Sequence, residues 1–135
     1  MTNPFRDQEK FMKACDQSTD RNNHAQFGLY VDLITEEVGE LNLAIDNNDN
    51  VEVLDALVDI LVVTIGAIHS MGASGEGAWK EVMRSNFAKI GEDGKVRKRE
   101  DGKVLKPIGW TPPNLKPYVN ESTSTATSRD ICGND

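Results

Sequence analysis

The feature that most constrains this sequence is a set of acidic residues inside two otherwise apolar stretches of helical periodicity. In the first stretch, apolar residues recur at steps of three and four and mark one stripe of a helix. That stripe consists of Tyr30, Leu33, Ile34, Leu41, Ala44 and Ile45. Glu37 and Glu40 fill the gap in the stripe and share one helix face. Because burying an unpaired charge costs several kcal/mol, the pattern predicts a cation beside these carboxylates.

The second stretch, residues 51–68, repeats this conflict between charge and apolar surroundings. Its only charged residues are Glu52, Asp55 and Asp59, and their spacing places them on one stripe. Two such helices joined by a short polar turn can face each other, so that their carboxylates form a cage of oxygen ligands. Carboxylates without cysteine or histidine nearby suit Mg²⁺, with Mn²⁺ as the alternative.

Each acidic stripe taken alone has a simpler explanation, namely the solvated face of an amphipathic helix. Glu52 also stands in the first turn of its helix, where a carboxylate stabilises the helix dipole without any metal. A membrane span over residues 51–68 is excluded, because each aspartate there would cost about 2.5–3.5 kcal/mol at a bilayer centre. Two acidic stripes only one turn apart favour the metal site.

The acidic segments resemble a known superfamily. Glu-Glu-x-x-Glu at residues 36–40, followed by a helix of the form Glu-x-x-Asp-x-x-x-Asp, is similar to the all-α nucleoside triphosphate pyrophosphohydrolases, which include the MazG-like enzymes. The segments Asp55–Leu61 and Ser85–Lys89 resemble its phosphoribosyl-ATP pyrophosphohydrolase-like branch, and the similarity covers roughly residues 5–115. Ala56 departs from the pattern, because many relatives carry a glutamate at that position.

The resemblance implies an enzyme that hydrolyses a nucleoside triphosphate, or a related nucleotide, between its α- and β-phosphates to give a monophosphate and pyrophosphate. Acidic residues of both helices would hold the Mg²⁺, namely Glu37, Glu40 and Asp59 with Asp55 or Glu52 as the fourth ligand. Glu36 or Glu37 would orient or deprotonate the attacking water. Polar and basic residues further along the chain would contact the substrate, namely Asn86, Lys89, Lys103 and Lys106.

Two other functions stay open. One is hydrolysis of phosphoribosyl-ATP itself, and the other is a non-enzymatic helical module that presents its acidic stripe to a basic partner. The net charge of −7 and the pI of about 4.8 argue against a nucleic-acid polymer as partner. Cys15 and Cys132 form no C-x-x-C pair and no signal-peptide-like apolar segment follows Met1, so we expect a reduced, cytoplasmic protein.

The helical pattern predicts an all-α, antiparallel bundle of about four helices. The helix over residues 51–70 is apolar almost all round beyond Ile60, so other helices must enclose it. One chain of 135 residues supplies few such helices, and we therefore expect partner subunits to complete the bundle, as a homodimer or homotetramer. The sequence does not indicate which of the two forms, the base or sugar of the nucleotide, its pathway, or the number of metal ions.

Past Ile90 the pattern changes from helical to extended. Two Asp-Gly pairs, at 93–94 and 101–102, predict tight turns in an arm over residues 91–106, which contains six lysines and arginines. The next segment is a proline-rich strap, and its Trp110 is predicted to anchor that strap rather than to stack on a base. We expect one domain over residues 1–118 and a disordered, Ser/Thr-rich tail over residues 119–135.

Overall fold

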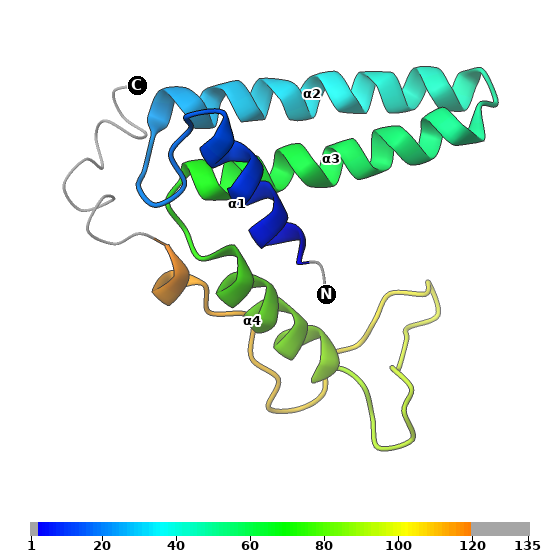
Figure 1. Ribbon diagram of the computed structural model, residues 1–135. Coiled ribbons are helices and arrows are strands. Elements are labelled where there is room, and N and C mark those ends of the chain that lie inside the picture. Colours follow the sequence, from blue (N-terminus) through cyan, green and yellow to red (C-terminus); the bar gives the residue numbers. More distant parts are fainter. Residues whose placement is uncertain (1–2, 120–135) are drawn as a thin grey trace. The chain divides into compact units, whose positions relative to one another are not determined.

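The computed structural model describes residues 3–119 and is helical in its regular elements (Figure 1). These elements are four α-helices and a short 3₁₀ helix: α1 (Pro4–Ala14), α2 (His24–Asp46), α3 (Asn50–Ser70), α4 (Gly75–Phe87) and Lys116–Tyr118. No strand occurs among the described residues. The prediction of an all-α fold with about four helices is confirmed, and completion of the bundle by other subunits stays a prediction. The predicted tail lies outside the described residues, apart from Val119.

Contacts divide the chain into two compact units. Within the described range, the first unit comprises residues 3–75 with Val119, and the second comprises residues 76–118. The first unit therefore contains α1, α2 and α3, and the second contains nearly all of α4 with the arm and strap that follow it. None of the helices within residues 3–119 combines the length and the apolar content that a membrane span requires.

The helices α2 and α3 pack side by side as an antiparallel hairpin (Figure 1). Each begins at a side-chain cap, which satisfies backbone N–H groups that have no partner within the helix. The Asn23 side chain accepts a hydrogen bond from the Gln26 N–H at 3.1 Å, and Asp49 accepts one from the Glu52 N–H at 3.1 Å. Between the helices, Asn48 adopts a φ of 55°, which asparagine tolerates better than most residues.

The core lies at one end of this hairpin, where α1 packs against α3. It consists of the buried residues Met12, Tyr30, Val63 and Ala67. The end of the hairpin near its turn has no such cover from α1 and leaves large apolar side chains exposed. Ile45, which the helical stripe predicts to be buried, is 52% exposed. That prediction is wrong for the single chain, because α1 covers only the opposite end.

Gly66 lets Tyr30 lie directly on α3. A Cβ atom at position 66 would be 2.3 Å from Cε1 of the Tyr30 ring, far inside van der Waals contact. The ring cannot swing away freely, because the Tyr30 hydroxyl donates a hydrogen bond to Gln17 Oε1 at 2.6 Å. The absence of a side chain at position 66 thus permits the close approach of α2 and α3 at this point.

We expect Gly66→Ala to lower the free energy of unfolding by about 1–3 kcal/mol, the usual cost of overfilling a packed core. Thermal melting followed by circular dichroism measures the loss. Gly28→Ala in α2 is the matched control, because a Cβ there meets no atom within 4 Å. That control should melt at the wild-type temperature or slightly above, since alanine favours a helix interior over glycine. Equal melting temperatures for Gly66→Ala and wild type would contradict the close approach of the Tyr30 ring to Gly66.

Candidate active site

Among the predicted acidic residues, Glu37 of α2 has the least favourable environment for a charged side chain. Its side chain is partly buried, and its Oε1 atom has no hydrogen-bond partner among the described residues. Burial raises the pKa of Glu37 above its ordinary value, and nearby negative charges raise it further. In decreasing order of effect, those charges are Glu40, Asp59, Asp55 and Glu36. The two helices thus place four carboxylates in the electrostatic environment of a fifth.

The predicted ligands on α3 differ in exposure. Asp59 is partly buried, whereas Asp55 and Glu52 are exposed. Ala56, where the resemblance expects glutamate, is only 4% exposed and packs within the hairpin as a small apolar residue. The Glu52 N–H takes part in the cap of α3, so Glu52 also occupies the first-turn position expected from its dipole role.

The carboxylates do not form a closed ligand set in this conformation. Among residues 3–119, no group of three or more His, Cys, Asp or Glu side chains is arranged to hold a metal ion. The metal ligands therefore stay a prediction. Their chemistry nevertheless suits a hard divalent cation, because all donors are carboxylate oxygens and one buried oxygen of Glu37 has no partner within residues 3–119. A cation near Glu37 would relieve both the burial of its charge and the repulsion from its neighbours.

The predicted substrate residues lie in the second unit, and two of them meet at one aromatic ring. The Lys89 Nζ atom is 5.3 Å from the centroid of the Trp110 ring, and the Lys106 Nζ atom is 4.8 Å from it. Asn86 Oδ1 accepts a hydrogen bond from Lys89 Nζ at 3.2 Å. Lys103 is placed elsewhere on the arm, in the second Asp-Gly turn, where its N–H donates to Asp101 Oδ1 at 3.0 Å.

The arm folds as the Asp-Gly pairs predict. Gly94 and Gly102 adopt φ values of 78° and 86°, which strongly favour glycine. Isolated antiparallel bridges join Ile90 to Val96 and Lys98 to Val104, so each turn closes locally without forming a regular strand. The arm is thus ordered by its own turns.

The strap, residues 107–114, is hydrogen-bonded to α4 by two side chains that the sequence did not single out, Glu81 and Arg84. Glu81 accepts hydrogen bonds from Arg84 Nε and Nη2 at 3.1 and 3.0 Å, and from the Asn114 N–H at 2.8 Å. Arg84 Nη2 also donates to the carbonyl oxygens of Thr111 and Pro112, at 3.4 and 3.3 Å. These residues were missed because a Glu-Arg pair three apart on a helix usually signifies only a surface ion pair.

The hydrogen bonds between the strap and Glu81 predict that the stability of the folded chain depends on pH. The hydrogen bond from Arg84, followed by that from the Asn114 N–H, holds the pKa of Glu81 below its ordinary value of 4.5. A carboxylate with a depressed pKa stabilises the folded state above its unfolded pKa, and this contribution is lost as pH falls through the folded value. We therefore expect Glu81→Gln to lower the melting temperature modestly at pH 7, and the deficit should shrink in acid, as the pH falls below the ordinary glutamate pKa of 4.5. Melting curves at pH 7 and in acid test this, with exposed Glu100→Gln as control; a deficit independent of pH would contradict it.

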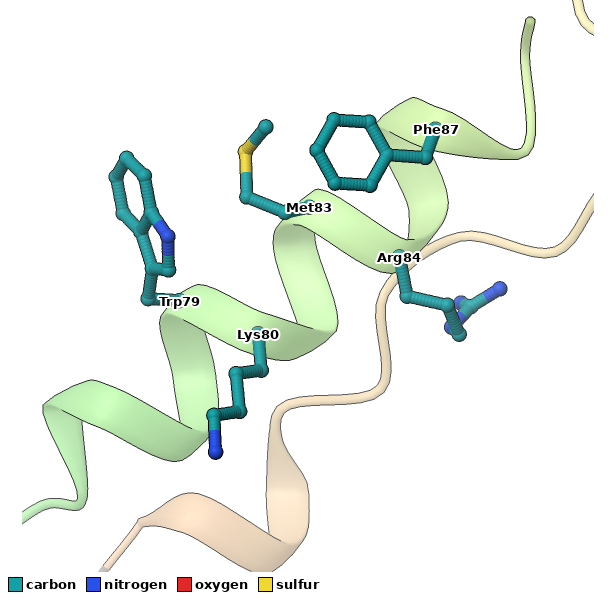
Figure 2. Close-up of a pocket in the computed structure, with 5 residues that line it drawn as sticks. All are labelled: Trp79, Lys80, Met83, Arg84 and Phe87. Carbon is teal, nitrogen blue, oxygen red and sulfur yellow. The ribbon is translucent and has the colours of Figure 1, made fainter.

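A shallow pocket of about 470 Å³ lies along α4 (Figure 2). Trp79, Met83 and Phe87 follow one another at four-residue steps, and Lys80 and Arg84 border them. Trp79 and Phe87 are 59% and 60% exposed although both side chains are large and apolar. None of the five lining residues belongs to the predicted site.

The resemblance to the MazG-like nucleoside triphosphate pyrophosphohydrolases implies an all-α fold, and in this all-α chain the two longest helices pair and carry acidic residues. A family model described as phosphoribosyl-ATP pyrophosphohydrolase matches residues 6–86, and the chain belongs to that family. The resemblance seen in the sequence is thereby confirmed, as is the expectation of an enzyme, since the family consists of hydrolases acting on phosphoric anhydrides. No curated protein matches the chain significantly in sequence.

Proposed function

We propose that this protein is a Mg²⁺-dependent nucleotide pyrophosphohydrolase that cleaves a nucleoside triphosphate, or a related nucleotide, between its α- and β-phosphates. The observation that carries the proposal is the buried Oε1 atom of Glu37, which lies near four further carboxylates and has no hydrogen-bond partner in the described part of the chain. Such an arrangement is unfavourable for the protein alone and becomes favourable beside a cation. Family membership supports the reaction class.

The carboxylates of α2 and α3 would divide the chemistry between metal binding and proton transfer. The ligands would be Glu37, Glu40 and Asp59, with Asp55 or Glu52 in the place of the glutamate missing at Ala56. Bound Mg²⁺, or Mn²⁺, supplies charge neutralisation of the phosphates and acidifies a water molecule. Exposed Glu36, or Glu37 itself, would accept the proton of that water as its oxygen bonds to phosphorus and the bridging P–O bond breaks.

The basic residues of the second unit would neutralise the phosphate chain. Phosphoryl transfer proceeds through a transition state with charge spread over the phosphate oxygens, so fixed cations assist it. Asn86, Lys89, Lys103 and Lys106 are the proposed contacts. Of these, Lys89 and Lys106 share the Trp110 ring, which supports a joint role for the two.

We also propose that two or four copies of the chain assemble through the hairpin. Large apolar side chains are exposed on both of its helices, and extensive exposed apolar surface marks an interaction site. On α3 they recur at helical steps: Leu54, Leu57, Val58 and Leu61, which are 63%, 45%, 48% and 62% exposed. A second copy is the occupant with a matching face, because an isologous contact pairs the same surface with itself. A cytoplasmic location stays a prediction.

A substrate panel with Mg²⁺, scored by pyrophosphate release, tests the activity. We expect turnover of canonical or modified deoxynucleoside triphosphates. Turnover of phosphoribosyl-ATP alone would support the second candidate, which the description of the matched family favours. No turnover of either class would favour the non-enzymatic acidic module. A panel repeated with Mn²⁺ and with EDTA identifies the metal requirement.

A further inference from the structure

The arm, residues 91–106, contains the same five residues twice. The segments 92–96 and 100–104 both read Glu-Asp-Gly-Lys-Val, and both fold into the same turn. The glycine φ is 78° at Gly94 and 86° at Gly102. In each turn the aspartate Oδ1 atom accepts a hydrogen bond of 3.0 Å from the N–H of the lysine two residues later. The glycine N–H donates at 2.9 Å to the carbonyl oxygen three residues earlier in both. The arm thus holds two copies of one turn with the same local sequence.

The two turns differ in what holds the aspartate side chain. Asp101 meets Arg99, whose Nη2 donates to its Oδ2 atom and whose Nε donates to its Oδ1 atom at 3.3 Å. Gly91 occupies the equivalent position of the first turn and has no side chain. Among residues 3–119, no ion pair involves Asp93. One guanidinium therefore restrains both carboxyl oxygens in the second turn, and no cation does so in the first.

An aspartate that precedes a glycine can react with its own backbone. The glycine nitrogen attacks the carboxyl carbon Cγ and forms a C–N bond, while one carboxyl oxygen leaves as water with its own proton and the proton of the N–H. Water then opens the resulting five-membered imide. Opening at the side-chain carbonyl restores aspartate, and opening at the backbone carbonyl gives isoaspartate, in which the chain runs through the side chain. Glycine favours this reaction because it has no Cβ to obstruct the attack and is conformationally free.

The Arg99 contact opposes this reaction at Asp101 in two ways. The carboxyl group must be protonated before its oxygen can leave as water, and the hydrogen bond from Arg99 holds the pKa of Asp101 below its ordinary value of 3.8. The side chain must also rotate to bring Cγ to the Gly102 nitrogen, and a guanidinium bound to both oxygens resists that rotation. The two side chains are 53% and 54% exposed, so solvent screens the pair and the expected protection is modest.

We propose that Asp93 is a site of spontaneous isoaspartate formation, and that Arg99 protects the second turn from the same reaction. The product keeps the mass and the formal charge of the parent but has one additional atom in its backbone. That atom falls inside a turn that closes through the Gly91 N–H, which donates to the Lys95 carbonyl oxygen at 2.8 Å, and through the bridge from Ile90 to Val96. Isomerisation would therefore open the first turn of the arm. The inference does not depend on the proposed enzymatic activity.

Incubation of the full chain at neutral pH and physiological temperature tests the site. Peptide mapping by liquid chromatography separates aspartyl from isoaspartyl peptides of equal mass, and electron-transfer fragmentation identifies the residue. We expect isoaspartate at residue 93 to accumulate about two to five times faster than at residue 101. In concentrated urea the two rates should be equal, because the local sequences are identical. Equal rates in the folded chain, no isoaspartate at residue 93, or a difference that persists in urea would overturn the proposal.

Exchanging the residue before each repeat tests the role of the guanidinium. Arg99→Gly should raise the rate at Asp101 to that at Asp93, and Arg97→Gln, on the same arm, should change neither rate. Gly91→Arg should slow the reaction at Asp93 to the rate at Asp101.

Gly91→Ala is the matched control for Gly91→Arg, because a Cβ at position 91 would already be 3.1 Å from Asp93 Oδ1. It should slow the reaction less than Gly91→Arg does. High salt should reduce the difference between the two turns, since it screens an exposed ion pair. An unchanged rate at Asp101 in Arg99→Gly, or equal slowing by Gly91→Ala and Gly91→Arg, would refute protection by the guanidinium.

Discussion

Glu37→Gln is expected to reduce pyrophosphate release by about 100-fold or more, the usual scale for loss of a group engaged in proton transfer. The substitution retains the shape of the side chain and removes the charge that would meet the metal. In wild-type protein, Mg²⁺ at 100 times its dissociation constant should stabilise the fold by about 2.7 kcal/mol. In Glu37→Gln most of that gain should vanish. Initial rates and melting curves with and without Mg²⁺ measure the two effects.

The same variant should behave in the opposite way when no metal is present. Because burial and neighbouring carboxylates raise the pKa of Glu37, the folded wild type loses stability as pH rises from the unfolded value of this group through its folded value. At pH 7 in EDTA, Glu37→Gln should therefore melt at or above the wild-type temperature, and the difference should disappear in acid. Stabilisation without metal, combined with loss of the Mg²⁺ response, is the expected signature of a metal-binding carboxylate.

Asp32→Asn is the matched control for Glu37→Gln. Asp32 is an exposed carboxylate on the same helix and belongs to no proposed ligand set. It should retain both the activity and the Mg²⁺ response of the wild type. If Mg²⁺ raised the melting temperature of Glu37→Gln as much as that of wild type, the proposed metal site on the hairpin would be refuted.

The double variant Leu57→Glu/Leu61→Glu is expected to abolish assembly of the chain. These residues lie one turn apart on α3 and are 45% and 62% exposed in the single chain. In a subunit interface both would be buried, and burial of a leucine contributes about 1.5–3 kcal/mol. Two glutamates in each copy would replace that gain with the cost of burying like charges. Light scattering after size-exclusion chromatography should show a dimer or tetramer for wild type and a monomer for the variant.

Ile108→Glu is the control for a general effect of surface charge. Ile108 is fully exposed in the strap, outside the hairpin. Its variant should keep the wild-type mass in solution. A monomeric wild type at micromolar concentration would contradict the proposed assembly, as would a double variant that retained the wild-type mass. Circular dichroism of both proteins ensures that the comparison is made between folded chains.

The sequence by itself determined the helices, because their signals are local. Asn23 and Asp49 cap α2 and α3, asparagines form the turn between them, and glycines occupy the tight turns of the arm. The periodicity also indicated that Glu37 conflicts with its surroundings, which follows from side-chain spacing alone. The same local patterns carried the family resemblance that the match over residues 6–86 confirmed.

Only the tertiary structure decided which of those residues meet partners distant in the sequence. It showed that Tyr30 rests on Gly66, that Ile45 is not covered within the single chain, and that one oxygen of Glu37 has no partner among the described residues. It also brought Lys89 and Lys106 to Trp110, although the two lysines lie on opposite sides of the arm. Caps and turns depend on neighbours within a few residues, and spacing reveals them. Burial and charge neutralisation depend on which elements pack together, so they emerge only when the chain has folded.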